Sequence, residues 1–143
     1  IWSFFGSGTS LQEFYINPHL LTPAMWDCLA AAAKWSQNNA EVLQDVHWIG
    51  GDPAKEEIYG YAAWQPGKGV FTLRNPSTKS QTISIDLQKI FELPGNSSSY
   101  FMLSNAINKN DTDAHKKVMK GKSFMVVLAP FELKVYDAIP LKD

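Results

Sequence analysis

The chain has 143 residues, of which 45% are hydrophobic, and a formal net charge of −1 at pH 7. A chain of this size can bury a core of its own, and with one arginine, Arg74, among thirteen basic residues a nucleic-acid-binding role is not expected. No apolar run approaches the ~20 residues needed to cross a bilayer, and the single cysteine, Cys28, excludes an internal disulfide.

The first segment predicts a short strand, Ile1–Phe5, followed by a loop that contains two glycines and a proline. Together with the helix that follows, this order forms a βα unit. The chain begins without methionine, inside an apolar run. We therefore expect it to be part of a longer polypeptide, with any targeting signal upstream of Ile1.

A long helix is predicted from Pro23 to about Leu43. Thr22 is suited to cap its first turn, and proline fits the first helical position. The polar residues of this segment fall on one narrow stripe, which consists of Asp27, Lys34, Asn38, Glu41 and Asp45. Because nearly every other position is apolar, we expect the helix to contact two partners, the following sheet and another part of a longer protein.

The segment Val46–Glu56 contains Gly50-Gly51 and Pro53, and it predicts a turn-rich connection. It divides the chain into a helical segment, residues 1–45, a linker, residues 46–56, and a β domain, residues 57–143.

Glu57–Asn75 predicts a β-hairpin. In Gln65-Pro66-Gly67-Lys68 the proline presets the first central turn position, and the glycine supplies the positive φ of a type II turn. The first strand is apolar on both faces. We therefore expect a second sheet to cover one face and a helix to cover the other.

The later strands alternate apolar and polar residues. They are expected at Thr82–Leu87, Tyr100–Leu103, Phe124–Leu128 and after Pro130, with a long loop or weak hairpin over residues 104–122. Pro130 is expected at the corner where the chain changes sheets. The fold class is therefore mainly β, an antiparallel β-sandwich of six to eight strands preceded by one strand, a loop and a long α-helix.

Two groups of residues offer alternative functions. His47, with Asp45, Asp52 and nearby serines, would be the centre of a small independent hydrolase, although no nucleophile-elbow motif is present. The aromatic residues Trp48, Tyr59, Tyr61 and Trp64 favour core packing. The alternative is a carbohydrate-binding module that uses Tyr59, Tyr61 or Trp64.

No metal site or cofactor is predicted. The three histidines match no zinc motif. The oxygens of Asn108, Asn110, Asp111 and Asp113 are dense enough for a weak calcium site, but the segment lacks the glycine and the distal glutamate of an EF-hand, which favours a solvated turn.

Several linked stretches resemble one known family. They are GSGTSLQEFYINPHLLTPAMWDCLAAAAKWSQNNAEVL from Gly6, DVHWIGGDP from Asp45, YGYAAWQPGKGVFTLRNPS from Tyr59, FELP from Phe91 and LAPFELKVYDAIP from Leu128. They resemble the C-terminal region of bacterial TIM-barrel glycoside hydrolases related to α-galactosidases, some relatives of which carry the label enterotoxin. The resemblance covers nearly the whole chain.

The resemblance implies a non-catalytic accessory domain. Ile1–Phe5 would be the last barrel strand and Pro23–Leu43 the last barrel helix, and the catalytic acids would sit on earlier strands that this sequence lacks. No catalytic residue is therefore assigned. Ser7, Glu13 and Tyr15 would border the substrate cleft of the parent enzyme. The implied partner is the N-terminal catalytic barrel of the same polypeptide, with an oligosaccharide as a further candidate, and the implied location is secreted or periplasmic.

Overall fold

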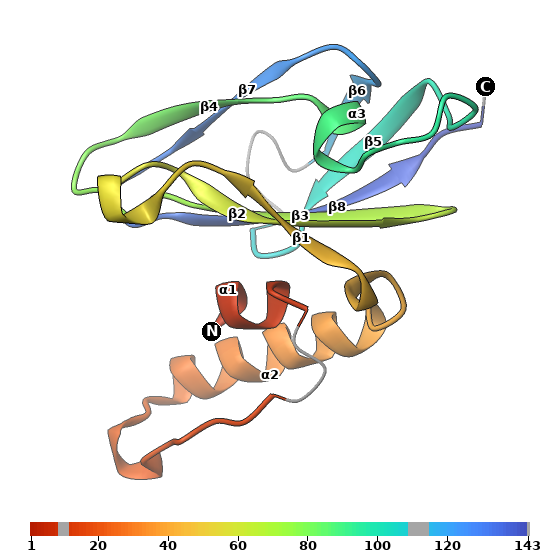
Figure 1. Ribbon diagram of the computed structural model, residues 1–143. Coiled ribbons are helices and arrows are strands. Elements are labelled where there is room, and N and C mark those ends of the chain that lie inside the picture. Colours follow the sequence, from red (N-terminus) through yellow and green to blue (C-terminus); the bar gives the residue numbers. More distant parts are fainter. Residues whose placement is uncertain (9–11, 109–114, 143) are drawn as a thin grey trace.

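The computed structural model describes residues 1–8, 12–108 and 115–142 in three layers (Figure 1). A six-stranded sheet lies between a layer of helices and a two-stranded sheet. The larger sheet has the order β1 (Val46–Gly50), β2 (Tyr59–Gln65), β3 (Lys68–Arg74), β8 (Leu133–Pro140), β5 (Tyr100–Asn105) and β6 (His115–Met119), and the smaller sheet pairs β4 (Gln81–Ile85) with β7 (Phe124–Leu128). All of these pairings are antiparallel. The predicted antiparallel β-sandwich is confirmed, with eight strands in the described residues.

The β2–β3 hairpin stands at the centre of this arrangement. Gln65 pairs with Lys68 across the turn, and Gly67 has a φ of 102°, which lies in the region that the predicted turn requires. Ala62 belongs to the core between the two sheets, and Ala63 belongs to the core beneath the helices. The expected coverage of this strand by a sheet on one face and a helix on the other is confirmed.

The core between the sheets is built from large apolar side chains. Phe71 on β3 stacks on Tyr136 of β8 with ring centroids 4.8 Å apart, and Ile85 and Leu128 close the core from the smaller sheet. The chain passes from β7 in the small sheet to β8 in the large one through the turn at Pro130, as predicted.

The helical layer contains α1 (Trp2–Gly6) and α2 (Pro23–Asn38), while α3 (Leu87–Ile90) lies beyond β4. The hydroxyl of Thr22 accepts a hydrogen bond from the Met25 N–H (3.3 Å), so the predicted helix start is confirmed. Trp35 is buried against the sheet, and its indole N–H donates to Asp137 of β8 (3.1 Å). In Figure 1 the N-terminal end of α2 lies farther from the sheet than its C-terminal end.

The predicted strand at Ile1–Phe5 is wrong, because residues 2–6 form helix α1. A strand needs a neighbouring strand for its ladder hydrogen bonds. None of the described strands pairs with this segment, and its backbone bonds locally, with the Phe5 N–H donating to the Ile1 carbonyl (3.2 Å). Gly6 allows close approach to the sheet, since a Cβ there would lie 2.4 Å from a methyl group of Thr72.

The helix predicted to reach Leu43 ends at Asn38. Asn39 is the C-cap residue: its backbone N–H and its side-chain N–H both donate to the Trp35 carbonyl, at 3.1 Å and 2.8 Å, and so satisfy one of the last carbonyls of the helix. The chain then makes a short 3₁₀ turn at Val42–Gln44.

Two further boundaries differ from the predictions. Val46–Gly50, expected to belong to a connection, forms edge strand β1, because its register with β2 satisfies its backbone. Leu87 is buried, as the apolar pattern indicated. It is, however, the first residue of helix α3 and not the last residue of a strand. The carboxylate of Asp86 accepts a hydrogen bond from the Gln88 N–H (2.9 Å) and caps that helix.

Candidate functional site

Three aromatic residues form a cluster on β1 and β2. Trp48 stacks on Tyr59 with ring centroids 5.0 Å apart and an interplanar angle of 6°, and it meets Tyr61 edge-on at 5.5 Å. These residues lie on the face of the six-stranded sheet that carries Ala63, which is the face covered farther along by α2. Trp48 is nonetheless 48% exposed. We call Trp48, Tyr59 and Tyr61 the aromatic surface.

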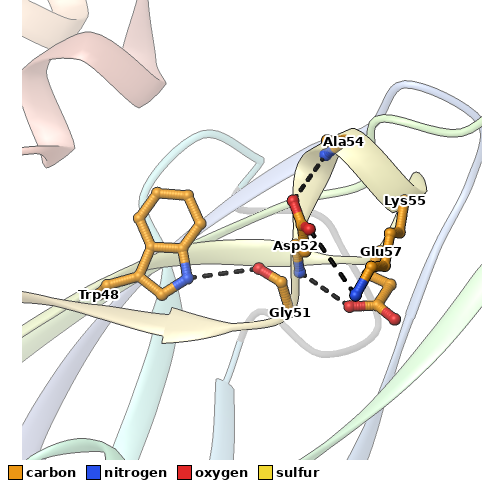
Figure 2. A network of polar contacts seen from close by, with 6 residues as sticks. All are labelled: Trp48, Gly51, Asp52, Ala54, Lys55 and Glu57. Atoms are coloured by element: carbon orange, nitrogen blue, oxygen red, sulfur yellow. Dashed lines mark hydrogen bonds and ion pairs between the residues drawn. The ribbon is translucent and has the colours of Figure 1, made fainter.

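A short loop fixes the position of Trp48 (Figure 2). Its indole N–H donates to the Gly51 carbonyl (3.3 Å). The next residue, Asp52, donates its backbone N–H to a Glu57 carboxylate oxygen (2.8 Å), and its own carboxylate accepts the Ala54 N–H (2.9 Å). These bonds hold the turn between β1 and β2 closed, so the orientation of the indole is set before any ligand arrives.

Trp64 does not belong to the aromatic surface. It follows the alternation of β2 to the opposite face and packs, half-buried, against the core between the sheets. Its indole N–H is buried without a hydrogen-bond partner in the described part of the chain. The structure thus brings Tyr59 and Tyr61 together and separates Trp64 from both.

Arg74 is a further residue at this site. It pairs with Tyr59 across the β2–β3 hairpin, so the two side chains leave the same face of the sheet. The predicted turn at Pro66-Gly67 already fixes this register, so the sequence carried the signal. The sequence indicates Trp48 as an aromatic residue but not its pairing with β2, because the pattern of Val46–Glu56 predicts a turn-rich connection.

Ser7, Glu13 and Tyr15, the three residues expected to border a substrate cleft, have different surroundings. The Ser7 hydroxyl donates to the Phe4 carbonyl (2.7 Å), while Glu13 is exposed and Tyr15 is 98% exposed. Within the described residues neither Glu13 nor Tyr15 makes a hydrogen bond. Their role as the border of a cleft stays a prediction.

His47 is bound to the backbone of another element. Its Nε2 lies 2.7 Å from the carbonyl oxygen of Ile90, the last residue of α3, and the ring is half-buried. Since a carbonyl only accepts, Nε2 is the protonated nitrogen of this pair. Within the described chain no serine or aspartate side chain hydrogen-bonds the ring. The observed contact ties β1 to α3, and nothing in it favours a hydrolytic centre.

No group of three potential metal ligands gathers among the residues that the structure describes. Three of the four residues of the candidate calcium loop, Asn110, Asp111 and Asp113, lie outside those residues. None of the helices in the described ranges is both long and apolar enough to cross a membrane.

A second exposed apolar feature is the N-terminal half of α2. Met25 and Trp26 are each 42% exposed, and Ala30 and Ala31 are exposed one turn later. The preceding turn adds Leu20, which is 75% exposed. The predicted polar stripe of the helix is exposed as well, and Cys28 and Leu29 in this half are only half-buried. We call Leu20, Met25, Trp26, Ala30 and Ala31 the α2 apolar face.

No protein-family model matches the chain, and no curated protein matches it in sequence. Solved structures do share its fold. One is named a putative α-N-acetylgalactosaminidase, from Bacillus halodurans (TM-score 0.55, 14% identity, 78% of this chain and 25% of that one). Another is an α-amylase from Geobacillus thermoleovorans complexed with acarbose (0.52, 14%, 90% and 24%). A third, AmyP in complex with maltose, has a TM-score of 0.50 at 15% identity and is matched over 82% of this chain and 21% of its own.

At these identities the similarities establish the fold alone. The chain spans about a quarter of the length of the first two of these enzymes, which are glycoside hydrolases. This agrees with the coarser part of the resemblance, a domain of the kind found in glycoside hydrolases. Neither an α-galactosidase specificity nor the enterotoxin label receives support from these structures.

Proposed function

We propose that the chain is a non-catalytic C-terminal β-sandwich domain of a glycoside hydrolase related to α-galactosidases, and that it stabilises the catalytic barrel. In this proposal residues 57–143 are the core of the domain, strand β1 extends its larger sheet, residues 51–56 join β1 to β2, and residues 1–45 pack next to the barrel. The domain carries no catalytic residue of its own.

The α2 apolar face is the observation that carries the proposal. A soluble helix normally turns its apolar stripe toward a core and a polar face toward water. The C-terminal half of α2 does this through Ala32 and Trp35, which are buried. The N-terminal half instead exposes Met25 and Trp26. A neighbouring catalytic domain of the same polypeptide would cover them, which agrees with fold neighbours that are about three to four times as long as this chain.

The stabilisation expected from this contact follows from the area of Trp26 that the contact would bury. About 250 Å² is the upper range for a tryptophan side chain, so the exposed 42% of Trp26 corresponds to roughly 100 Å² and about 2 kcal/mol when buried. Trp26→Ser should therefore lower the stability of a longer polypeptide by about 2 kcal/mol, and it should leave the 143-residue chain within about 0.5 kcal/mol. Trp48→Ser, which removes a tryptophan of similar exposure on β1, serves as the matched control, because it should change the stability of both proteins by the same amount.

The activity test compares the 143-residue chain with the longest polypeptide of the same reading frame. Both are assayed with p-nitrophenyl α-D-galactopyranoside and p-nitrophenyl N-acetyl-α-D-galactosaminide. Turnover is expected only for the longer polypeptide. Turnover by the 143-residue chain, or a reading frame without βα units bearing paired carboxylates, would contradict the proposal.

We also propose, from the resemblance, that the parent enzyme is secreted or periplasmic. Fractionation of cells that express the complete reading frame tests this, and recovery in the secreted or periplasmic fraction is the expected result.

A further inference from the structure

We infer that the aromatic surface, together with Arg74, is a binding site for a neutral hexopyranose unit of an oligosaccharide. This goes beyond the accessory role proposed above, because it concerns a site of the 143-residue chain itself and holds whether or not a catalytic domain is attached.

The indole of Trp48 has one open face. Tyr59 covers the other face in a parallel stack at 5.0 Å, and Tyr61 abuts the ring at 84°. Because these contacts account for one side and one edge, the 48% of Trp48 that is exposed includes the opposite side. The axial C–H groups of a pyranose form a flat, weakly positive surface, and the face of an aromatic ring is negative. An open indole face of this kind matches one sugar ring.

Polar groups with hydrogen-bonding capacity lie on the same face of the sheet as this indole. The hydroxyl groups of Tyr59 and Tyr61 make no hydrogen bond to any described residue. Arg74 is exposed on the same face beside Tyr59, and it forms no ion pair with the described residues. A guanidinium group offers five N–H donors, and each phenol both donates and accepts. This mixture of donors and acceptors suits the hydroxyl groups of a sugar.

The charges at the border favour a neutral ligand. Asp52 and Glu57 lie in the loop beside Trp48, as Figure 2 shows, and Lys55 is paired with Asp52 at 3.9 Å. The two carboxylates of the loop disfavour an anionic sugar nearby, and Arg74 on β3 disfavours a cationic ligand. A neutral sugar avoids both repulsions.

The size of the surface favours a sugar over a protein partner. A stable protein interface buries about 800 Å² on each partner. The aromatic surface consists of three rings, two of them half-buried, and charged residues border it on the loop side. An area of this extent accommodates one or two sugar rings. The hydrogen bond from the indole to Gly51 and the Asp52–Glu57 contact reduce the ordering cost of binding, because the ring is already held in place.

The test is a titration of the ¹⁵N-labelled 143-residue chain with two neutral probes, maltoheptaose and stachyose, followed through the indole N–H resonances. The expected result is a saturable shift of the Trp48 resonance with at least one probe and no shift of the Trp26 resonance. Trp48→Ala should weaken binding at least tenfold, and Trp26→Ala, which removes a tryptophan of similar exposure from α2, should leave it unchanged. Arg74→Ala should weaken binding severalfold.

The wild-type titration does not depend on any variant folding, so it decides the question alone if Trp48→Ala is unfolded. Absence of a Trp48 shift with both probes at millimolar concentration would overturn the inference. Binding that survives in a folded Trp48→Ala protein would do so as well. Either result leaves the accessory role untouched, because that role is judged by the longer polypeptide and by Trp26.

Discussion

Asp137 on β8 should hold helix α2 to the six-stranded sheet. Its carboxylate accepts the Trp35 indole N–H at 3.1 Å and lies 3.6 Å from the Lys68 ammonium group. Replacement by alanine leaves the indole N–H of a buried tryptophan without an acceptor, which costs about 1–3 kcal/mol. Loss of the partly exposed ion pair adds up to about 1 kcal/mol. We expect Asp137→Ala to lower the free energy of unfolding by about 2–3 kcal/mol.

Urea unfolding followed by tryptophan fluorescence measures this change, and a thermal scan checks it. With an unfolding entropy of about 2.1 cal/mol/K for each of 143 residues, 2–3 kcal/mol corresponds to a fall in Tm of roughly 7–10 °C.

Asp137→Asn is the matched control for this prediction. Its amide oxygen still accepts from Trp35, so only the ion pair is lost, and the cost should stay at or below about 1 kcal/mol. Equal losses for the two variants, or a loss below 0.5 kcal/mol for alanine, would refute the reasoning that the hydrogen bond to Trp35 fixes α2.

Two further variants test other single contacts. His47→Phe removes the bond to the Ile90 carbonyl and should cost about 1 kcal/mol in urea unfolding without changing any activity of the chain. Asn75→Ala should be the most damaging polar substitution, about 3 kcal/mol or more, since this fully buried amide donates to the carbonyls of Lys79 (2.8 Å) and Ala129 (2.9 Å) and accepts from a backbone N–H.

Sequence reasoning succeeded where a local signal determines local structure. The Pro66-Gly67 pair fixed the hairpin and its register, the Thr22-Pro23 pair fixed the start of α2, and Pro130 marked the passage between sheets. In each case the backbone preference of one or two residues agrees with the tertiary structure. The register of the hairpin also placed Arg74 beside Tyr59, which made part of the candidate site predictable.

It failed where the structure of a segment depends on distant partners. Ile1–Phe5 and Val46–Gly50 are both short and apolar, yet the first is a helix and the second a strand. The difference lies in the availability of a strand to pair with: β2 offers an edge to Val46–Gly50, and no described strand offers one to Ile1–Phe5. Because the second segment was not predicted as a strand, the stack of Trp48 on Tyr59 was not predicted either.

Gly60 provides a test of how much the fold depends on its central hairpin. It pairs with Leu73, and a Cβ at this position would lie 1.7 Å from the Thr72 carbonyl oxygen, a backbone atom that cannot move without separating β2 from β3. Gly60→Ala should therefore cost more than about 3 kcal/mol or prevent folding, well above the usual range for a point variant.

Gly95→Ala is the control, since nothing lies within 4 Å of its Cβ position, and by restricting the unfolded chain it should be neutral or slightly stabilising. Circular dichroism and urea unfolding of the two proteins measure the contrast. A Gly60→Ala protein as stable as the Gly95→Ala protein would mean that the two strands separate at little cost, and the close pairing of β2 and β3 would then not be what holds the layers together.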